Sequence, residues 1–381
     1  MKQTISIVLN LCLGLFIVGG VVSVFDDSLR LLWGLHLLTA ISAILSLIAF
    51  LIVIVVYGLM GLTPMIPKRV FLPVTLFYAA GVLAVFPTMI YCSDWVRGSM
   101  KLDWATSVCQ VVVGLAILWW LRGGLEFRWP LVPDDYLGHR RFSWLNLSLF
   151  VLVNVFVALP AVAFYFVLCG AIAVSHFTAG FLTVHPSGLR SQVRQYTRSD
   201  GKEIELVPMA HVADADFYQK ISESFPTNSI VLMEGVTDNK NLLKHGISYK
   251  RMAKTLGVSE QMEEFKPQGK RVMADVDVDE FSSNTIDLLN VAMLIHANGL
   301  NADTVMKLAA YSAPTNLDQE IIGDLITKRN QHLLATLQAE LPQSDIIIVP
   351  WGAGHMPAIA AAIQKQGFHL TGSNDYTVIR F

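Results

Sequence analysis

Long apolar stretches alternate with short polar ones along the first half of the chain. Each stretch is near or above the roughly 20 residues that a helix needs to cross a bilayer. They are Thr4–Phe25, Leu31–Leu59, Phe71–Cys92, Trp104–Leu121 and Leu145–Ile172. The pattern therefore predicts a transmembrane region of about five helices within residues 1–180.

The apolar stretch that starts at Leu145 continues to Val184 and is long enough to be considered as two spans. No polar turn divides it, and Pro160 is better explained as a kink than as a hairpin turn. We therefore predict one long span followed by a segment at the membrane interface. The first stretch is long for a signal-peptide core and further spans follow it, so we expect it to be retained.

Basic residues in the predicted loops indicate the orientation. With the N-terminus inside, the inner segments hold Lys2, Lys68, Arg69, Arg122, Arg128, Arg140 and Arg141, and the outer loops hold Arg30, Arg97 and Lys101. This excess satisfies the positive-inside rule. Five spans then place the C-terminal domain outside the cytoplasm, in an integral membrane protein of the bacterial inner-membrane type, whereas six would place it inside.

The predicted spans carry few polar side chains. Asp, Glu, Lys and Arg are absent from their middles, and Asn10, His36 and Asn154 stand alone there. Isolated side chains of this kind usually form hydrogen bonds between packed helices, whereas transporters need buried ionisable groups. The membrane region is therefore expected to be an anchor or platform.

The second half changes to short alternating patterns. A hairpin is predicted from Ser191–Arg198 and Glu203–Val207, with Ser199-Asp-Gly-Lys as its turn. Further strands are expected at Phe181–Val184, Ser229–Met233, Lys270–Val276 and Asp345–Val349, and helices at Asp214–Ser224, Ser283–Asn298, Leu317–Leu341 and Pro357–Gln366. Alternating strands and helices indicate a soluble α/β domain over residues 181–381, with a mixed, largely parallel sheet.

Composition supports this division. The chain is 53% hydrophobic and 15% charged, and residues 1–180 hold 10 basic and 7 acidic residues against 18 and 23 in the remainder. No basic patch suggests a nucleic-acid partner. All four cysteines lie in the apolar half without the spacing of metal ligands, which favours packing roles.

Three predicted strands are followed by a histidine or a carboxylate, namely His211, Glu234 and His355. In an open α/β sheet, ligands collect outside the carboxyl ends of the strands. Two imidazoles and a carboxylate at that edge suit a divalent metal ion or acid–base chemistry. Gly352 and Gly354, just before His355, would allow the backbone to approach a ligand closely.

Arg329 adds a second kind of signal, because it lies on the apolar stripe of the predicted helix Leu317–Leu341. An inward guanidinium is costly unless it meets a carboxylate or an anionic ligand. A structural ion pair or a snorkelling side chain are the alternatives. Asn330 could donate to the same site.

Asp275, Asp277 and Asp279 form the densest acidic cluster. Alternation at the end of a strand would direct them to one side, where they could bind metal or orient the histidines. A solvated loop with a helix N-cap is the alternative.

Five pieces occur together in a characteristic order: Val207–His211, Leu232–Glu234, Ala274–Asp277, Lys328–Asn330 and Trp351–Pro357. Over residues 181–381 this order resembles the TraB/PrgY, GumN and Tiki superfamily. That family is marked by two Gly-x-x-His motifs with an intervening Glu and an Arg-containing helix. Pro208 stands where the first motif normally has glycine, and proline fixes φ and removes a backbone donor.

The resemblance implies a membrane-anchored, metal-dependent hydrolase that cleaves peptides or exposed protein segments. Tiki-like members are membrane-tethered proteases that use manganese or cobalt outside the cell, whereas TraB and PrgY are associated with shutting down peptide pheromones. His211, Glu234 and His355 would be metal ligands or the base, and Arg329 would stabilise negative charge.

Two other functions are compatible with the same residues. A non-catalytic regulator that binds a peptide or small ligand is favoured by Pro208. An esterase-like hydrolase of small molecules is suggested by erythromycin esterases, which have a related fold. Because fold does not fix chemistry, the arrangement of the site must decide among them.

Overall fold

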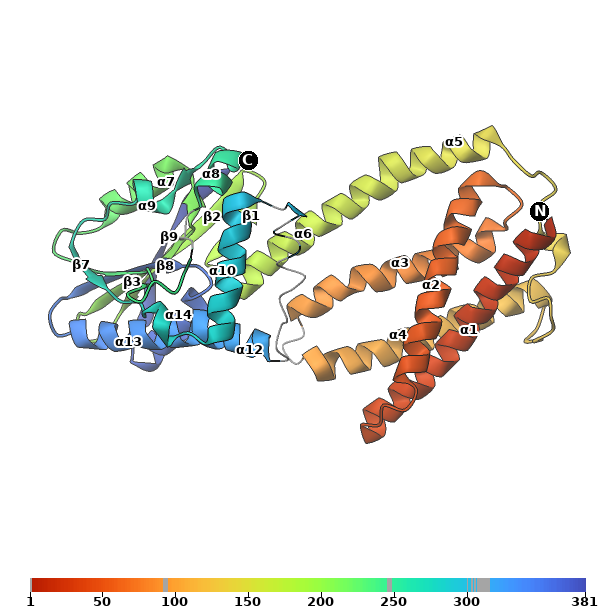
Figure 1. The fold of residues 1–381 in the computed structure, drawn as a ribbon, viewed down its shortest axis with the longest axis horizontal. Coiled ribbons are helices and arrows are strands. Elements are labelled where there is room, and N and C mark those ends of the chain that lie inside the picture. The colour runs from red at the N-terminus through yellow and green to blue at the C-terminus, as the bar shows by residue number, and fades with distance from the viewer. Residues whose placement is uncertain are drawn as a thin grey trace. The chain divides into compact units, whose positions relative to one another are not determined.

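The computed structural model describes residues 2–91, 95–244, 249–299, 301, 302, 304, 306 and 316–381. The chain divides into two compact units, Met1–Gly170 and Ala171–Phe381. Figure 1 shows the helices of the first unit and the sheet, covered by helices, of the second.

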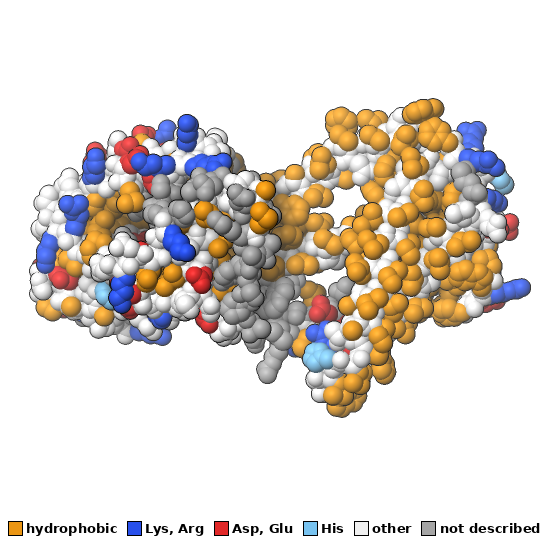
Figure 2. Space-filling model, in the orientation of Figure 1, with side chains coloured by type: hydrophobic (Ala, Val, Ile, Leu, Met, Phe, Trp, Pro, Cys, Tyr) orange, Lys and Arg blue, Asp and Glu red, His pale blue; other side chains and the backbone are white. Residues whose placement is uncertain are grey.

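Among the described residues, five helical segments are long and apolar enough to cross a membrane, as predicted. Hydrophobic side chains cover most of the face of these helices that Figure 2 shows. They are α1 (Lys2–Trp33), α2 (Thr39–Leu62), α3 (Lys68–Tyr91), α4 (Trp95–Arg122, apolar from Met100) and a continuous segment of α5 (Trp144–Val153), η2 (Asn154–Ala158) and α6 (Leu159–Phe177). The 3-10 turn η1 (Asp134–Tyr136) precedes α5. The last span therefore continues to Phe177, five residues beyond its predicted end, as one undivided helical segment.

Polar side chains of the spans bond to neighbouring segments. The Tyr57 hydroxyl donates to Asn154 Oδ1 at 2.6 Å, and Asn10 Oδ1 accepts from the backbone N–H of Val132 at 2.9 Å. These contacts fit the packing role expected for both asparagines. His36 differs, because α1 ends at Trp33 and Gly34 takes a positive φ of 68°, so this histidine lies in the loop before α2.

The second unit contains a mixed seven-stranded sheet within its described residues. Its order is β1 (Leu182–His185), β2 (Gly188–Thr197), β3 (Glu203–Met209), β8 (Ile346–Gly352), β5 (Ile230–Met233) and β7 (Lys270–Met273), with β9 (His369–Arg380) paired to β2. β3, β8, β5 and β7 run parallel, whereas β1, β2, β3 and β9 pair antiparallel through β2. The mixed sheet and the predicted hairpin are confirmed.

Helices cover both faces of this sheet (Figure 1). α13 (Arg329–Glu340) and α14 (Met356–Lys365) pack on one face, where Leu333 contacts the core around Ile347. α7 (Ala215–Ser224) and the short α9 (Gln261–Glu264) lie on the other face, where Phe217 packs near Ile348. Because side chains alternate along a strand, β8 contributes to both cores, and each fully buried aliphatic side chain stabilises the fold by about 1.5–3 kcal/mol.

The remaining elements lie at the carboxyl ends of the parallel strands. They are the small sheet of β4 (Val212–Ala213) with β6 (Ser259–Glu260), the helices α8 (Lys250–Leu256) and α10 (Ser283–Asn298), and the 3-10 turn η3 (Val278–Glu280). α10 begins and ends where the sequence predicts it.

The predicted helix Leu317–Leu341 contains an irregularity. α12 (Leu317–Ile322) passes through a π-helical turn, η4 (Gly323–Lys328), before α13 begins. A π turn inserts one residue and rotates the side chains that precede it relative to those that follow. The predicted apolar stripe is therefore wrong at Ile322, which is 59% exposed, but holds at Leu333 and Leu337.

Candidate functional site

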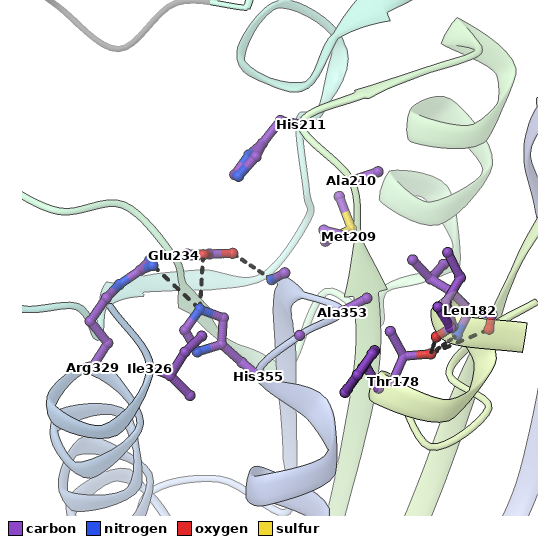
Figure 3. A pocket seen from close by; sticks show the side chains of 15 residues that line it. Thr178, Leu182, Met209, Ala210, His211, Glu234, Ile326, Arg329, Ala353 and His355 are labelled. Atoms are coloured by element: carbon purple, nitrogen blue, oxygen red, sulfur yellow. Dashed lines mark hydrogen bonds and ion pairs between the residues drawn. The ribbon is translucent and has the colours of Figure 1, made fainter. Parts of the chain in front are cut away.

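The carboxyl ends of the four parallel strands meet at one edge of the sheet, and each delivers a polar side chain there. β3 leads to His211, β5 to Glu234, β7 to Asp275 and β8, through a tight turn, to His355. A pocket of about 580 Å³ opens at this edge and is lined by His211, Glu234, Arg329 and His355 among others, all of them from the second unit. These four predicted residues therefore share one pocket, which the predicted Gly352 and Gly354 also line (Figure 3).

Glu234 and His355 form the inner part of the pocket. His355 Nε2 lies 3.7 Å from Glu234 Oε1, and Glu234 Oε2 accepts from the backbone N–H of Gly352 at 2.5 Å. His355 Nδ1 is 2.7 Å from Asn330 Oδ1. Because an amide oxygen can only accept, Nδ1 carries the proton and Nε2 keeps its lone pair.

The charge of His355 follows from its surroundings. The side chain is only 5% exposed, and this burial lowers its pKa below the ordinary value, although the carboxylate of Glu234 acts in the opposite direction. The imidazole is therefore neutral at pH 7 and can accept a proton at Nε2.

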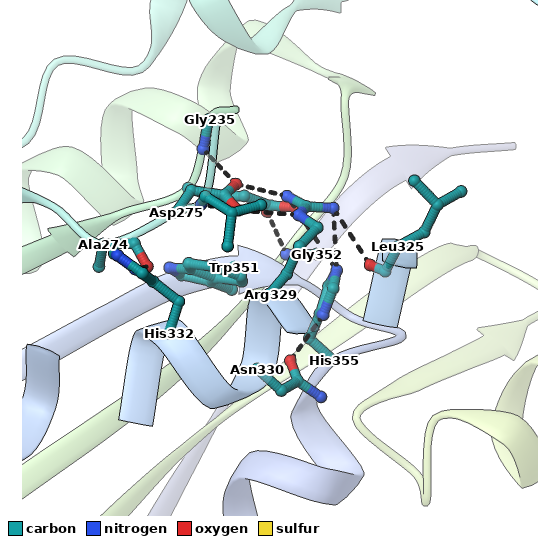
Figure 4. A network of polar contacts seen from close by, with 12 residues as sticks. Gly235, Ala274, Asp275, Leu325, Arg329, Asn330, His332, Trp351, Gly352 and His355 are labelled. Atoms are coloured by element: carbon teal, nitrogen blue, oxygen red, sulfur yellow. Dashed lines mark hydrogen bonds and ion pairs between the residues drawn. The ribbon is translucent and has the colours of Figure 1, made fainter. Parts of the chain in front are cut away.

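Arg329 connects the two carboxylates and the imidazole (Figure 4). Its Nε and Nη2 donate to the two oxygens of Asp275 at 2.9 and 2.7 Å, and Nη2 also donates to Glu234 Oε1 at 2.8 Å. Its Nη1 lies 3.3 Å from His355 Nε2. With His355 neutral, two carboxylates face one guanidinium, and the cluster carries a net charge of about −1.

Asp275 is an orienting residue for Arg329, with a side chain that is completely buried. Its two oxygens also accept from the backbone N–H groups of Gly235 and Val276, each at 2.9 Å. Burial acts to raise the pKa of this carboxyl, but the hydrogen bonds and charge of Arg329 outweigh it and hold the pKa below its usual range. The bidentate pair fixes the plane of the guanidinium at the pocket.

Asp277 and Asp279 do not share this position, because β7 ends at Met273 and the expected alternation stops there. Asp277 caps the 3-10 turn η3 by accepting from the Asp279 N–H at 3.1 Å, and it accepts from the Thr237 hydroxyl at 2.7 Å. Asp279 pairs with Lys240 at 2.9 Å. Asp277 therefore has the alternative role of an N-cap. Of the three aspartates, Asp275 is the one that bonds to Arg329 at the site.

His211 stands apart from the buried cluster, at the open side of the pocket (Figure 3). Its exposed ring stacks on Tyr249 with centroids 4.6 Å apart and an interplanar angle of 6°. The backbone N–H of Tyr249 donates to Glu260 Oε1 at 2.6 Å, and that of Gln261 donates to the His211 carbonyl at 3.0 Å. His211 is thus contacted twice, by the ring of Tyr249 and by the backbone of Gln261.

Tyr249 is a residue that the sequence pattern did not indicate, since it follows no strand and belongs to no motif. Burial and the charge of Glu234 raise its pKa, which places this hydroxyl in the field of the same cluster. It is therefore a positioning residue for His211.

Replacing Tyr249 by leucine should reduce kcat/KM of the activity proposed below by about 3–10-fold, because an aromatic pair contributes about 0.5–1.5 kcal/mol. Tyr249→Phe keeps the ring and should retain near-normal kcat/KM. Steady-state kinetics of both variants measures the difference. Equal losses in the two variants would show that the hydroxyl, and not the stack, is what matters.

The glycines of the turn after β8 are not crowded by the protein itself. A Cβ on Gly352 would lie 3.5 Å from the Glu234 oxygens, an ordinary contact, and one on Gly354 would meet no atom within 4 Å. Neither position therefore requires glycine because of a neighbouring protein atom. The contribution of Gly352 is its backbone N–H, which binds Glu234.

Pro208 lies inside β3, where its register partner in β8 is Trp351. Its carbonyl accepts from the Ser191 hydroxyl at 2.8 Å, and the strand continues through Met209. The proline therefore leaves the approach of β3 to the pocket intact, with His211 two residues beyond the end of the strand.

A divalent ion needs several nitrogen or oxygen donors close together, and the pocket offers donors of these kinds. Two imidazoles, a carboxylate and a net negative charge suit such an ion chemically. Among the residues that the structure describes, however, no three His, Cys, Asp or Glu side chains are grouped closely enough to hold one. Glu234 Oε1 is bonded to Arg329, so an ion would have to replace that bond.

Comparison with known proteins does not assign the chain to a family. Neither protein-family models nor curated proteins nor solved structures give a match to the chain. The functional argument therefore rests on the geometry of the site.

Proposed function

We propose that this chain is a membrane-anchored hydrolase that cleaves peptides or exposed protein segments, as its resemblance to the TraB/PrgY, GumN and Tiki superfamily implies. One observation carries the proposal: a neutral imidazole, His355, lies beside the carboxylate of Glu234 and the guanidinium of Arg329 in one pocket, and its unprotonated Nε2 accepts from Arg329 Nη1 at 3.3 Å. This set combines a base with a donor for developing negative charge.

The residues suggest the following reaction. As the oxygen of a water molecule attacks the peptide carbonyl carbon, a proton of that water passes to His355 Nε2. Arg329 donates to the oxyanion that forms, and the C–N bond breaks as Nε2 returns the proton to the leaving amine. A positioned base contributes about 10²–10⁴-fold and one oxyanion donor about 10²–10³-fold to such rates.

The proposal includes a divalent metal ion, manganese or cobalt by resemblance, held by His211 and Glu234. His355 is kept as the base, because its Nε2 cannot bind a metal ion and accept a proton at once. Bound there, it would lower the pKa of its water and polarise the scissile carbonyl. Glu234 would then give up its bond to Arg329, which keeps both bonds to Asp275. The net negative charge of the cluster favours this exchange.

The five apolar helical segments support membrane association, and the excess of inner basic residues gives the proposed orientation. With the N-terminus in the cytoplasm, the second unit and its pocket would lie on the outer face. The natural substrates would then be peptides or protein segments outside the cytoplasm.

The proposal is tested with the full chain purified in detergent and stripped of metal by a chelator. Adding manganese or cobalt should bring about cleavage of a peptide library, followed by mass spectrometry, and one bound ion per chain by elemental analysis. His211→Ala should lower both. His369→Ala, at the exposed start of β9 and outside the pocket lining, is the matched control and should change neither. Absence of cleavage with either metal would refute the proposal.

A second function, binding without turnover, is favoured by one specific feature. Both oxygens of Glu234 are already hydrogen-bonded, to Arg329 and to Gly352, which is the arrangement of a satisfied structural carboxylate. A regulator of this kind would bind a peptide stoichiometrically and release it intact. The same mass-spectrometric measurement separates the two functions.

A further inference from the structure

One wall of the pocket comes from the end of the last membrane-spanning segment. Ala173, Val174 and Phe177 of α6 and the adjacent Thr178 line it, together with Leu182. Figure 3 shows Thr178 and Leu182 on one side and Glu234, Arg329 and His355 on the other. The pocket therefore has an apolar half built by the span and a polar half built by the sheet edge.

The joint between α6 and the sheet is a short, hydrogen-bonded turn. The Thr178 hydroxyl accepts from the Leu182 N–H at 3.0 Å, and the Gly180 N–H donates to the Ser175 carbonyl at 2.8 Å. Arg194 of β2 donates to the Ala179 carbonyl at 2.9 Å. Such a turn fixes the helix end to the domain, so the pocket cannot move away from the last turns of α6 as it could on a flexible linker.

Apolar side chains remain exposed along α6 up to its last residue. Val167 is open to the surroundings, and Phe177, which also lines the pocket, is 61% exposed. The apolar segment Trp144–Phe177 has 34 residues, more than the roughly 20 that cross the hydrocarbon core. The apolar surface of α6 therefore runs without a polar break from Val167 to the pocket wall at Val174.

We propose that the pocket takes polypeptide segments lying directly beside a membrane span of the substrate protein. This inference rests on the proposed function and names its substrate class. Such a segment passes from apolar to polar surroundings within a few residues, as the pocket does between Val174 and His355. Its apolar residues contact the α6 wall while the peptide bond that follows reaches the polar half. An acyl chain alone would fill the apolar half and would place no polar group against the polar half of the pocket.

The test uses the full chain in phospholipid nanodiscs with three probes that carry the same randomised peptide segment. In one the segment follows a single apolar span directly; in the second a Gly/Ser spacer of about 25 residues holds it roughly 25–30 Å away. The third is the free segment. Cleavage of the first should be at least tenfold faster than of the second and third. Equal rates for all three would overturn the inference while leaving the hydrolase proposal standing.

Two variants make the test specific to the apolar wall. Val174→Trp should fill the pocket beside that wall and remove most of the preference for the membrane-adjacent segment. Val167→Trp, two turns earlier on the same helix and outside the pocket, should leave this preference unchanged. Preference retained in Val174→Trp would contradict the inference.

A binding readout separates the two proposals. A photoreactive side chain at position 174, in a chain that also carries His355→Ala, should crosslink the membrane-adjacent probe in preference to the spaced one. Crosslinking without any cleavage by the unmodified chain would refute the hydrolase and keep the substrate class. Equal crosslinking of both probes, or none, would refute the substrate class.

Discussion

Replacing His355 by alanine is expected to lower the rate of peptide hydrolysis by about 10²–10⁴-fold, because the variant loses the base that accepts a proton from water. His355 is buried among the elements that form the pocket, and its unprotonated nitrogen is Nε2, which accepts from Arg329 Nη1 at 3.3 Å. Glu234→Gln keeps the shape of its side chain but loses the charge, and should have a loss of similar size. Initial rates on a peptide cleaved by the unmodified chain measure both effects.

Asn330→Ala gives a graded comparison, since it removes only the acceptor that holds the proton on Nδ1 of His355. Its activity should lie between those of the unmodified chain and His355→Ala.

Because burial lowers the pKa of His355, the unmodified chain should gain activity as pH rises, with a midpoint below the ordinary value of 6.5. Full activity in His355→Ala would show that His355 is not the base of the reaction.

Replacing Arg329 by methionine is expected to destabilise the second unit by about 3–5 kcal/mol at pH 7, because it leaves buried carboxylates without their partner. Asp275 has no exposed side-chain surface and Glu234 has little. Hydrogen exchange of the β8 amides in the full chain measures the loss. Arg271→Met removes an exposed guanidinium instead and should change the free energy of opening by less than about 0.5 kcal/mol.

The pH dependence of this loss has a definite sign. In the unmodified chain the pKa of Asp275 is held below its usual range, so its contribution is present above about pH 4, the unfolded pKa, and is lost as pH falls through the folded pKa. Without Arg329, burial raises the pKa above the unfolded value. The variant's deficit should therefore be small near pH 3 and grow toward pH 7. A deficit that does not vary with pH would mean that lost packing, and not charge, causes it.

Local patterns in the sequence predict most of the helices and strands that position the site. Apolar length alone predicts the five spans, and short β-branched runs predict β5 and β8, because burial imposes these patterns directly. The convergence of His211, Glu234 and His355 followed from one topological rule, that parallel strands end at the same edge.

Other features depend on tertiary contacts that a single sequence does not reveal. β9 contains Gly372-Ser-Asn-Asp375, residues typical of turns, yet it forms a long strand because β2 supplies its hydrogen bonds. The π turn before Arg329 alters the helix phase, and the single glycine with which it begins, Gly323, does not predict such a turn by itself. Tyr249 reaches His211 only through the fold, as does the α6 wall of the pocket.

The central claim, that Glu234 and His355 form a hydrolytic site, is tested most directly by mass balance in water enriched in oxygen-18. The full chain, supplied with manganese or cobalt, is incubated with one peptide, and all of the peptide is recovered and weighed by mass spectrometry. We expect two fragments per cleaved peptide, with oxygen-18 in the new carboxyl terminus, and intact peptide only from His355→Ala. Recovery of the peptide intact and stoichiometrically bound to the unmodified chain would contradict the account and identify a binding protein.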